Sequence, residues 1–293
     1  MPKIDVGDDI DLLKKQAIEG LRNDEEVYRL IHEDLHLSSA QVKAFLATLL
    51  DYQEDVSYCA HCPGYDACDK ANPHFEMCLK MEEGQLMRYF SPCRVVRKME
   101  ELESRYIVRD FPEQWQELDF RSVDKTQKRM DAVAAMIALI RGKPLSPWIY
   151  LCGTHGSGKS YLLAMFANTY ARTHKGCAYC DTSALIDKLK ELQINAKKDF
   201  EERFALLCEC PLLCLDDFGN EFKTDFVFSS ILFPLLSARD KAGLPTAFSS
   251  DFPIEDIETM YSAKIGAPRA RQLRQLLFHN CKKQFDVSGL KIY

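Results

Sequence analysis

The segment WIYLCGTHGSGKSYLL (148–163) restricts the fold more than any other part of this chain. Its apolar start is typical of a buried parallel strand, and a helical pattern follows its glycines. The intervening turn matches the pattern G-x-x-x-x-G-K-[ST] in full. The matching residues are Gly153, Thr154, His155, Gly156, Ser157, Gly158, Lys159 and Ser160. A glycine-rich turn between a strand and a helix predicts a phosphate-binding loop.

Each residue type in this loop has a physical role in nucleotide binding. The glycines let the backbone turn its N–H groups toward phosphate oxygens, and the following helix presents its positive end to the same anion. Lys159 is expected to reach the β- and γ-phosphates, and Ser160 to bind Mg²⁺. ATP and Mg²⁺ are therefore the predicted ligands. The alternative is a glycine-rich turn that binds nothing.

Carboxylates follow two of the other apolar segments. The segment 212–215 ends at Asp216 and Asp217, where the carboxyl edge of a parallel sheet opens into a crevice. Asp216 is predicted to hold Mg²⁺ through water, and Asp217 to orient the attacking water. Asp251 ends the segment PTAFSSD, where a polar side chain would face the γ-phosphate. The alternative for each site is a solvated turn.

Short apolar strands alternate with helices from residue 125 onward, which favours an α/β domain with a mostly parallel sheet flanked by helices. The expected strands are 148–152, 177–181, 212–219 and 246–250. The expected helices are 131–141, 159–172, 183–192, 198–208, 224–241 and 269–283.

The first part of the chain has a different pattern. Residues 8–55 carry apolar side chains at helical spacing, and Ser38 to Gln41 reads as a capping box. Pro112 interrupts the pattern after a charged helix. We therefore expect a small, mainly helical domain in residues 1–105 and an ATPase domain in residues 106–293.

Five of the 12 cysteines lie between Cys59 and Cys93. The spacing Cys59-x-x-Cys62 is typical of one half of a structural zinc site. The second half is open on spacing alone, since His74-x-x-x-Cys78 fits a compact finger. Free buried cysteines or a redox pair are the alternatives. The other seven cysteines lie mostly in or beside apolar segments, where packing is the expected role.

Composition limits the class of protein and the cellular compartment that we expect. A hydrophobic content of 46% and a charged content of 28% fit a globular protein. No apolar run approaches the roughly 20 residues that span a bilayer, and the first residues are acidic. We expect a cytoplasmic protein, in which a cysteine cluster is more often metal-binding than disulfide-bonded.

The net charge of −6 does not favour nucleic-acid binding, but it hides an asymmetry. Residues 1–58 contain 6 Lys and Arg against 13 Asp and Glu, whereas residues 264–293 contain 7 against 1. Such a difference between the two ends suggests different partners. The alternative is ordinary charge scatter on solvated helices.

The ordered motifs of the second half resemble the AAA+ helicase loaders of the DnaC/DnaI class. They are GTHGSGKS, LLCLDDFGNE, PTAFSSD and GAPRARQLRQLL, ending in DVSGL. CAHCPGYDAC, His74 and SPC before RVVRK resemble the zinc-binding N-terminal domain of the same loaders. The resemblance covers about residues 10–293.

This resemblance implies an ATP-dependent loader in the primosome. It would place the replicative hexameric helicase on single-stranded DNA when replication initiates or restarts. The N-terminal domain would bind the helicase. The AAA+ domain would bind ATP and single-stranded DNA, and would associate with neighbouring loader subunits.

The resemblance also assigns residues in the ATPase domain. Lys159 and Ser160 match the Walker A pair, and Asp216 and Asp217 match the Walker B acids. Asp251 stands where the family usually has a sensor Asn.

An arginine finger is implied as well. Arg271 matches the first Arg of the family motif R-x-x-E-R. The later positions of that motif read Arg274-Gln275 here, so Arg269 and Arg274 remain candidates.

For the zinc site the resemblance selects Cys59, Cys62, His74 and Cys93, with Cys68 and Cys78 as further candidates. Four protein ligands would close the coordination sphere, so the zinc would be structural and not catalytic.

Two other functions fit parts of the pattern. A transposition helper ATPase of the IstB kind would act on duplex DNA, but such helpers typically lack a zinc module. A nucleotide-switch adaptor would bind ATP and barely hydrolyse it.

Overall fold

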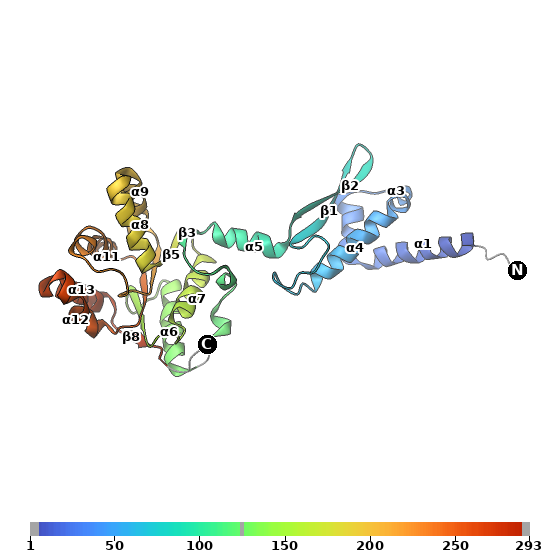
Figure 1. The fold of residues 1–293 in the computed structure, drawn as a ribbon. Coiled ribbons are helices and arrows are strands. Elements are labelled where there is room, and N and C mark those ends of the chain that lie inside the picture. Colours follow the sequence, from blue (N-terminus) through green and yellow to red (C-terminus); the bar gives the residue numbers. More distant parts are fainter. Residues whose placement is uncertain (1–5, 124–125, 289–293) are drawn as a thin grey trace. The chain divides into compact units, whose positions relative to one another are not determined.

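The computed structural model describes residues 6–123 and 126–288, and its contacts divide the chain into two units (Figure 1). Unit 1 is Met1–Glu100 and unit 2 is Glu101–Tyr293. Helix α5 (Arg94–Glu103) crosses this division. The boundary expected from the sequence, between residues 105 and 106, falls just before strand β3 (Tyr106–Arg109).

Unit 1 begins with helices that pack around a small apolar core. They are α1 (Val6–Asn23), α2 (Glu25–Arg29), the π-helical turn η1 (Leu30–Asp34), α3 (Ser39–Ala44) and α4 (Leu46–Ala60). The core side chains are Leu21, Val27, Ile31, Leu37, Leu49, Tyr52 and Leu79. The predicted capping box is confirmed, because Ser38 and Gln41 bond reciprocally at the start of α3.

A β-hairpin completes unit 1 and was not expected from the sequence. Strands β1 (Phe75–Glu82) and β2 (Gln85–Pro92) are antiparallel, with Glu82 opposite Gln85. Their two-residue turn has positive φ at both positions, 50° at Glu83 and 80° at Gly84. Mirror-image turns of this kind match the twist of paired strands. The description "mainly helical" was therefore incomplete.

Unit 2 contains a six-stranded sheet in the order β3-β5-β6-β7-β4-β8, and all of its pairings are parallel. The strands besides β3 are β4 (Trp148–Cys152), β5 (Cys177–Asp181), β6 (Leu212–Asp216), β7 (Thr246–Ser250) and β8 (Gln284–Asp286). The central strands are buried along nearly their whole length. Parallel sheets need such cover on both faces.

Helices supply that cover (Figure 1). One face packs against α6 (Gln127–Ile140) and α7 (Lys159–Ala171). The other packs against α8 (Thr182–Asn195), α9 (Lys197–Glu209), α11 (Phe233–Ala242), α12 (Ile254–Ile265) and α13 (Ala267–Asn280). Short turns η2 (Glu113–Trp115), η3 (Phe120–Ser122), α10 (Asp225–Val227) and η4 (Phe228–Leu232) connect these elements. The predicted α/β class is confirmed.

The remaining differences from the sequence prediction are three elements that were not expected and two whose bounds differ. Strands β3 and β8 and helix α12 were not expected, and the expected strand 212–219 ends at Asp216. The expected helix 224–241 is divided into α10, the π-helical turn η4 and α11. Within residues 6–123 and 126–288, we find no helix whose length and hydropathy would allow it to cross a membrane.

Candidate nucleotide site and cysteine cluster

The loop Gly153–Ser160 joins β4 to α7, as the sequence predicted. Gly153, Gly156 and Gly158 have φ values of 151°, 78° and 82°. A side chain would be strained in this region of φ. At Gly153 a Cβ atom would also lie 2.9 Å from Ser288 Oγ. The glycines therefore fix a tight turn that ends at Gly158, the N-cap of α7, so Lys159 and Ser160 are the first residues of that helix.

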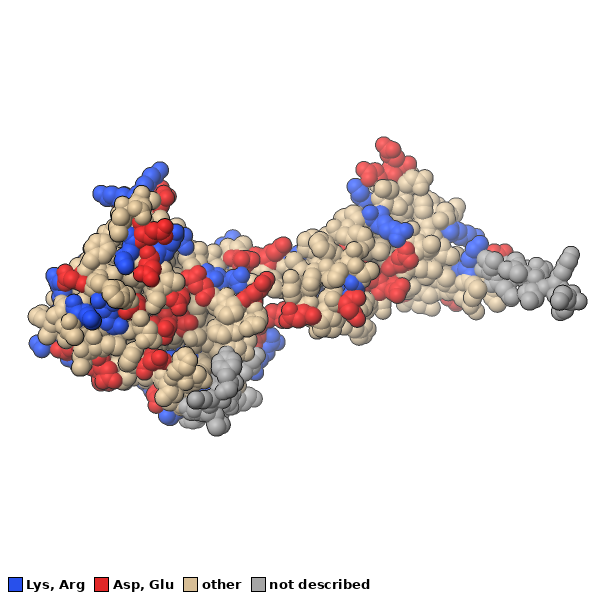
Figure 2. Space-filling model, viewed as in Figure 1, with Lys and Arg blue, Asp and Glu red and all other residues tan. Residues whose placement is uncertain are grey.

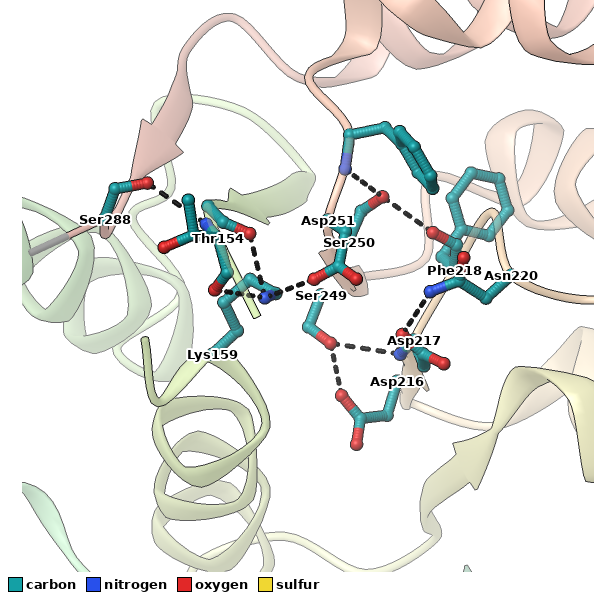
Figure 3. Close-up of polar contacts among 12 residues, drawn as sticks. Thr154, Lys159, Asp216, Asp217, Phe218, Asn220, Ser249, Ser250, Asp251 and Ser288 are labelled. Carbon is teal, nitrogen blue, oxygen red and sulfur yellow. Dashed lines mark hydrogen bonds and ion pairs between the residues drawn. The ribbon is translucent and has the colours of Figure 1, made fainter. Parts of the chain in front are cut away.

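The Lys159 side chain is nearly buried at the start of α7. Its ammonium donates to Gly153 O at 2.9 Å, to Thr154 O at 3.1 Å and to Asp251 Oδ1 at 2.7 Å (Figure 3). The predicted Walker A lysine and the acid that ends β7 are thus direct partners.

The remaining loop residues are held from two sides. Thr154 N donates to Ser288 Oγ at 3.2 Å, and the buried Arg129 donates to Ser157 O at 3.0 Å. The Ser157 hydroxyl is buried without a hydrogen-bond partner among the residues that the structure describes. A buried polar atom of this kind needs a partner, and a phosphate oxygen would supply one. The loop therefore fits a phosphate group.

The Asp216 carboxylate at the end of β6 is fixed by two hydroxyl groups. Tyr179 OH donates to Oδ2 at 2.7 Å. Ser249 Oγ donates to Oδ1 (Figure 3). Burial, and then the nearby Asp216, raises the pKa of Tyr179 well above its usual value, so the phenol stays protonated as a donor. The carboxylate is thereby oriented at the carboxyl edge of the sheet, where a hydrated Mg²⁺ would lie.

Asp217 begins the turn after β6 in a left-handed conformation, with φ of 55°. Its backbone N–H donates to Ser249 Oγ at 3.1 Å, and its carboxylate accepts from Asn220 Nδ2 at 2.7 Å (Figure 3). Aspartate tolerates this conformation better than most residues. The turn directs the Asp216 and Asp217 side chains to different partners.

The buried Glu221 ties this turn to α12. It accepts from Gly219 N at 2.7 Å and from the Tyr261 hydroxyl. Burial raises the pKa of Glu221. No role was predicted for Glu221, Tyr179 or Arg129, because each acts through a partner from a distant element.

The arginines of α13 are paired with acids from other elements. Arg271 Nε lies 3.1 Å and Arg274 Nε 2.8 Å from the Glu258 carboxylate, and Arg269 pairs with Asp225. Arg271 is the most exposed of the three, at 60%, against 45% for Arg269 and 33% for Arg274. The structure does not bring them to the phosphate loop of the same chain.

The basic side chains near the end of the sequence are therefore partly neutralised by acidic side chains from other elements. Lys283 also pairs with Asp131 on α6, at 3.0 Å. On the face in Figure 2, Lys and Arg are interspersed with Asp and Glu over unit 2. Charge scatter, the alternative weighed from the sequence, describes these pairs better than a single basic surface.

The candidate zinc ligands line one cavity of unit 1, with a volume of about 460 Å³. Its lining includes Cys59, Cys62, Cys68, His74, Cys78 and Cys93. Cys59 lies in the last turn of α4, and Cys62 follows that helix. The hairpin register, with Phe75 opposite Pro92, brings His74 and Cys93 together, and Cys93 N donates to His74 O at 2.9 Å.

Cys78 has other partners, since its thiol lies 3.3 Å from Ser91 Oγ. Lys70 occupies the same region, with its ammonium 3.3 Å from Cys59 Sγ and 2.5 Å from Asp55 Oδ1. Across residues 6–123 and 126–288, no group of three or more His, Cys, Asp or Glu side chains is arranged to hold a metal ion. The cavity gathers suitable donors without forming a closed coordination shell.

The cysteines of unit 2 are free thiols, mostly buried in the sheet and its helices. Burial raises the pKa of Cys152 and Cys210 to about 11, and it also raises the pKa of Cys180 and Cys214 well above the usual value. Such thiols remain protonated and unreactive, which agrees with a packing role.

Comparison with known proteins supports the resemblance seen in the sequence. The chain is 24% identical over 258 residues to the replicative helicase loader DnaI of Bacillus subtilis (strain 168), covering 83% of this chain and 80% of that one. Unit 2 alone makes up about two thirds of the chain, so the match also includes part of unit 1. No family model matches the chain.

Two solved structures share the fold. A crystal structure of DnaI matches with a TM-score of 0.52 and 24% identity, covering 63% of this chain and 98% of that one. A Streptococcus pyogenes serotype M3 protein described as a primosome component matches with a TM-score of 0.53 and 22% identity, covering 66% and 98%. The parallel α/β fold predicted for unit 2 is confirmed, and the expected sequence resemblance to DnaI-type helicase loaders is confirmed as well.

Proposed function

We propose that this chain is an ATP-dependent loader of a hexameric replicative DNA helicase. It would place the helicase on single-stranded DNA when replication initiates or restarts. The observation that carries this proposal is the match to the DnaI loader across both units. A phosphate loop alone occurs in ATPases of many functions, so the fold of unit 2 would not be sufficient.

The nucleotide chemistry is assigned to unit 2. Lys159 would bind the β- and γ-phosphates, and Ser160 with Asp216 would hold Mg²⁺. Asp217 would orient the attacking water. Hydrolysis would serve as an assembly switch, in which the ATP-bound chains associate with each other and contact single-stranded DNA.

The helicase contact is assigned to unit 1. Cys59, Cys62, His74 and Cys93 would hold a structural Zn²⁺ between the end of α4 and the open end of the hairpin. The juxtaposition of His74 with Cys93, and the contact of the Cys78 thiol with Ser91 instead, support this set over one that contains Cys78. Zinc binding would require Lys70 to move away from Cys59.

The test of this function is a loading assay with purified components. The full chain is mixed with the replicative helicase of the same organism, ATP and circular single-stranded DNA, and the helicase bound to DNA is measured after gel filtration. We expect more bound helicase with the chain than without it. Binding to duplex DNA, with no effect on the helicase, would favour the transposition-helper alternative.

Zinc content gives a second test. The full chain is expected to retain about one zinc per chain after dialysis, and a Cys59→Ser/Cys62→Ser variant to retain none. This variant should lose helicase binding but keep ATP turnover, because its changes lie in unit 1. Mass spectrometry of the metal content provides the measurement.

Cys78→Ser is the matched control for that experiment and should retain zinc. A wild-type chain without zinc would refute the metal assignment. If Cys78→Ser loses zinc and Cys93→Ser retains it, the fourth ligand is Cys78 and not Cys93.

The arginine finger can be identified from the dependence of turnover on protein concentration. If Arg271 acts in a neighbouring subunit, wild-type turnover per chain should rise with concentration as subunits associate. Arg271→Ala should remove this rise, whereas Arg269→Ala and Arg274→Ala should keep it. If turnover still rises with concentration in Arg271→Ala but not in one of the other two variants, the arginine changed in that variant is the finger.

A further inference from the structure

The contact between Lys159 and Asp251 is the feature of the nucleotide site that its expected chemistry does not explain. A lysine ammonium has three hydrogen-bond donors. In this structure they point to Gly153 O, Thr154 O and Asp251 Oδ1, so all three have acceptors (Figure 3). The Lys159 side chain is 7% exposed and that of Asp251 28%. The pair is therefore largely shielded from solvent, where charge interactions are strong.

Strand order places Asp251 at the phosphate end of the site. Strands β4 and β7 are parallel neighbours, with Cys152 opposite Ser250. Gly153 and Asp251 are the next residues along each strand, so the phosphate loop and this carboxylate begin side by side. A group that touches the Lys159 ammonium lies near the β- and γ-phosphates that this lysine would bind.

The local charge balance is unfavourable for an additional anion. Asp216, Asp217 and Asp251 stand at the ends of the adjacent strands β6 and β7. The Lys159 ammonium is already paired with one of these carboxylates. A terminal phosphate must compete with Asp251 for Lys159, and the displaced carboxylate then repels it.

We propose that Asp251 is a specificity-determining residue that disfavours ATP relative to ADP. The γ-phosphate adds negative charge at the end of the nucleotide nearest Asp251, so the carboxylate opposes ATP more strongly than ADP. This inference rests on the proposed nucleotide-binding function of unit 2. It implies that the isolated chain favours ADP more than an otherwise identical chain with a neutral residue at this position.

The experiment compares ATP and ADP binding to the full-length chain by isothermal titration calorimetry in the presence of Mg²⁺. Asp251→Asn has nearly the same shape and removes one negative charge. We expect it to tighten ATP binding about tenfold, as removal of one like charge several ångströms away predicts. ADP binding should change by less than about threefold, because ADP has no γ-phosphate and its remaining charges lie farther from Asp251.

Two further variants control for charge and fold. Asp251→Glu keeps the charge and should keep the wild-type ratio of ATP to ADP affinity. Asp187→Asn makes the same chemical change on the exposed surface of α8 and should alter neither affinity. Thermal unfolding measured for each variant verifies that it is folded.

The possible results distinguish failure of the proposed nucleotide-binding function from failure of the inference about Asp251. If the wild-type chain binds neither nucleotide, the proposed function of unit 2 fails and the inference fails with it. If the wild type binds both nucleotides and Asp251→Asn changes them equally, or not at all, only the inference fails. Weaker ATP binding in Asp251→Asn would overturn it as well, and would make Asp251 a ligand of the nucleotide or its Mg²⁺.

Discussion

Lys159→Ala is expected to lower ATP turnover by about 10³-fold, the upper range for removing one preorganised group that stabilises transition-state charge. Lys159 is the cation directed into the phosphate loop, and its stem is held at the start of α7. Lys159→Arg keeps the positive charge but not the compact ammonium, so we expect it to fail as well. Turnover is measured as phosphate release from ATP and Mg²⁺.

Lys188→Ala is the matched control, since Lys188 is an exposed residue of α8 that pairs with Glu191. Its turnover should equal that of the wild type. Helicase binding should survive in Lys159→Ala, because that contact is assigned to unit 1. Wild-type turnover in Lys159→Ala would place hydrolysis elsewhere in the chain.

Arg239→Ala is expected to destabilise unit 2 by about 3–5 kcal/mol, because it removes several buried hydrogen bonds from a charged donor. Arg239 on α11 is fully buried. Its guanidinium donates to Leu207 O at 2.8 Å, to Cys210 O at 2.9 Å and to Thr246 Oγ1 at 2.9 Å. It thereby joins the end of α9 to the start of β7, and its loss would leave several buried acceptors unpaired.

The measurement is urea unfolding followed by tryptophan fluorescence. Both tryptophans, Trp115 and Trp148, lie in unit 2, so the signal reports that unit alone. Lys241→Ala, an exposed change on the same helix, should alter the free energy of unfolding by less than about 0.5 kcal/mol. An equally small effect of Arg239→Ala would mean that water replaces the lost hydrogen bonds.

The phosphate loop could be predicted because the residues that determine its conformation are consecutive in the sequence. Eight consecutive residues, a strand before them and a helix after them determine its conformation. Asp216 and Asp251 were predictable for a related reason, since the carboxyl ends of parallel strands meet at one edge of the sheet. Their hydrogen-bond partners were not predictable. Tyr179 and Lys159 find these acids only after the strands are ordered in space.

The elements that the sequence missed are those with weak or competing patterns. Strand β8 has three residues, too few for a period to be seen. The hairpin of unit 1 has a recognisable Glu83-Gly84 turn, but the residues around it were interpreted only as candidate zinc ligands. The acids that neutralise Arg269 and Arg271 come from other elements, so a count of charge along the chain overstated the basic character of that region.

The contact of Thr154 with Ser288 joins positions 134 residues apart. Ser288 follows strand β8, which pairs with β4 next to the phosphate loop. This support for the loop therefore depends on a pairing between strands that are far apart in the sequence. Such pairings form late, because chain entropy opposes them until the intervening elements have folded. During synthesis on the ribosome, the loop would therefore lack this support until β8 had emerged. A nascent chain would then have a complete unit 1 before its phosphate loop was fully supported.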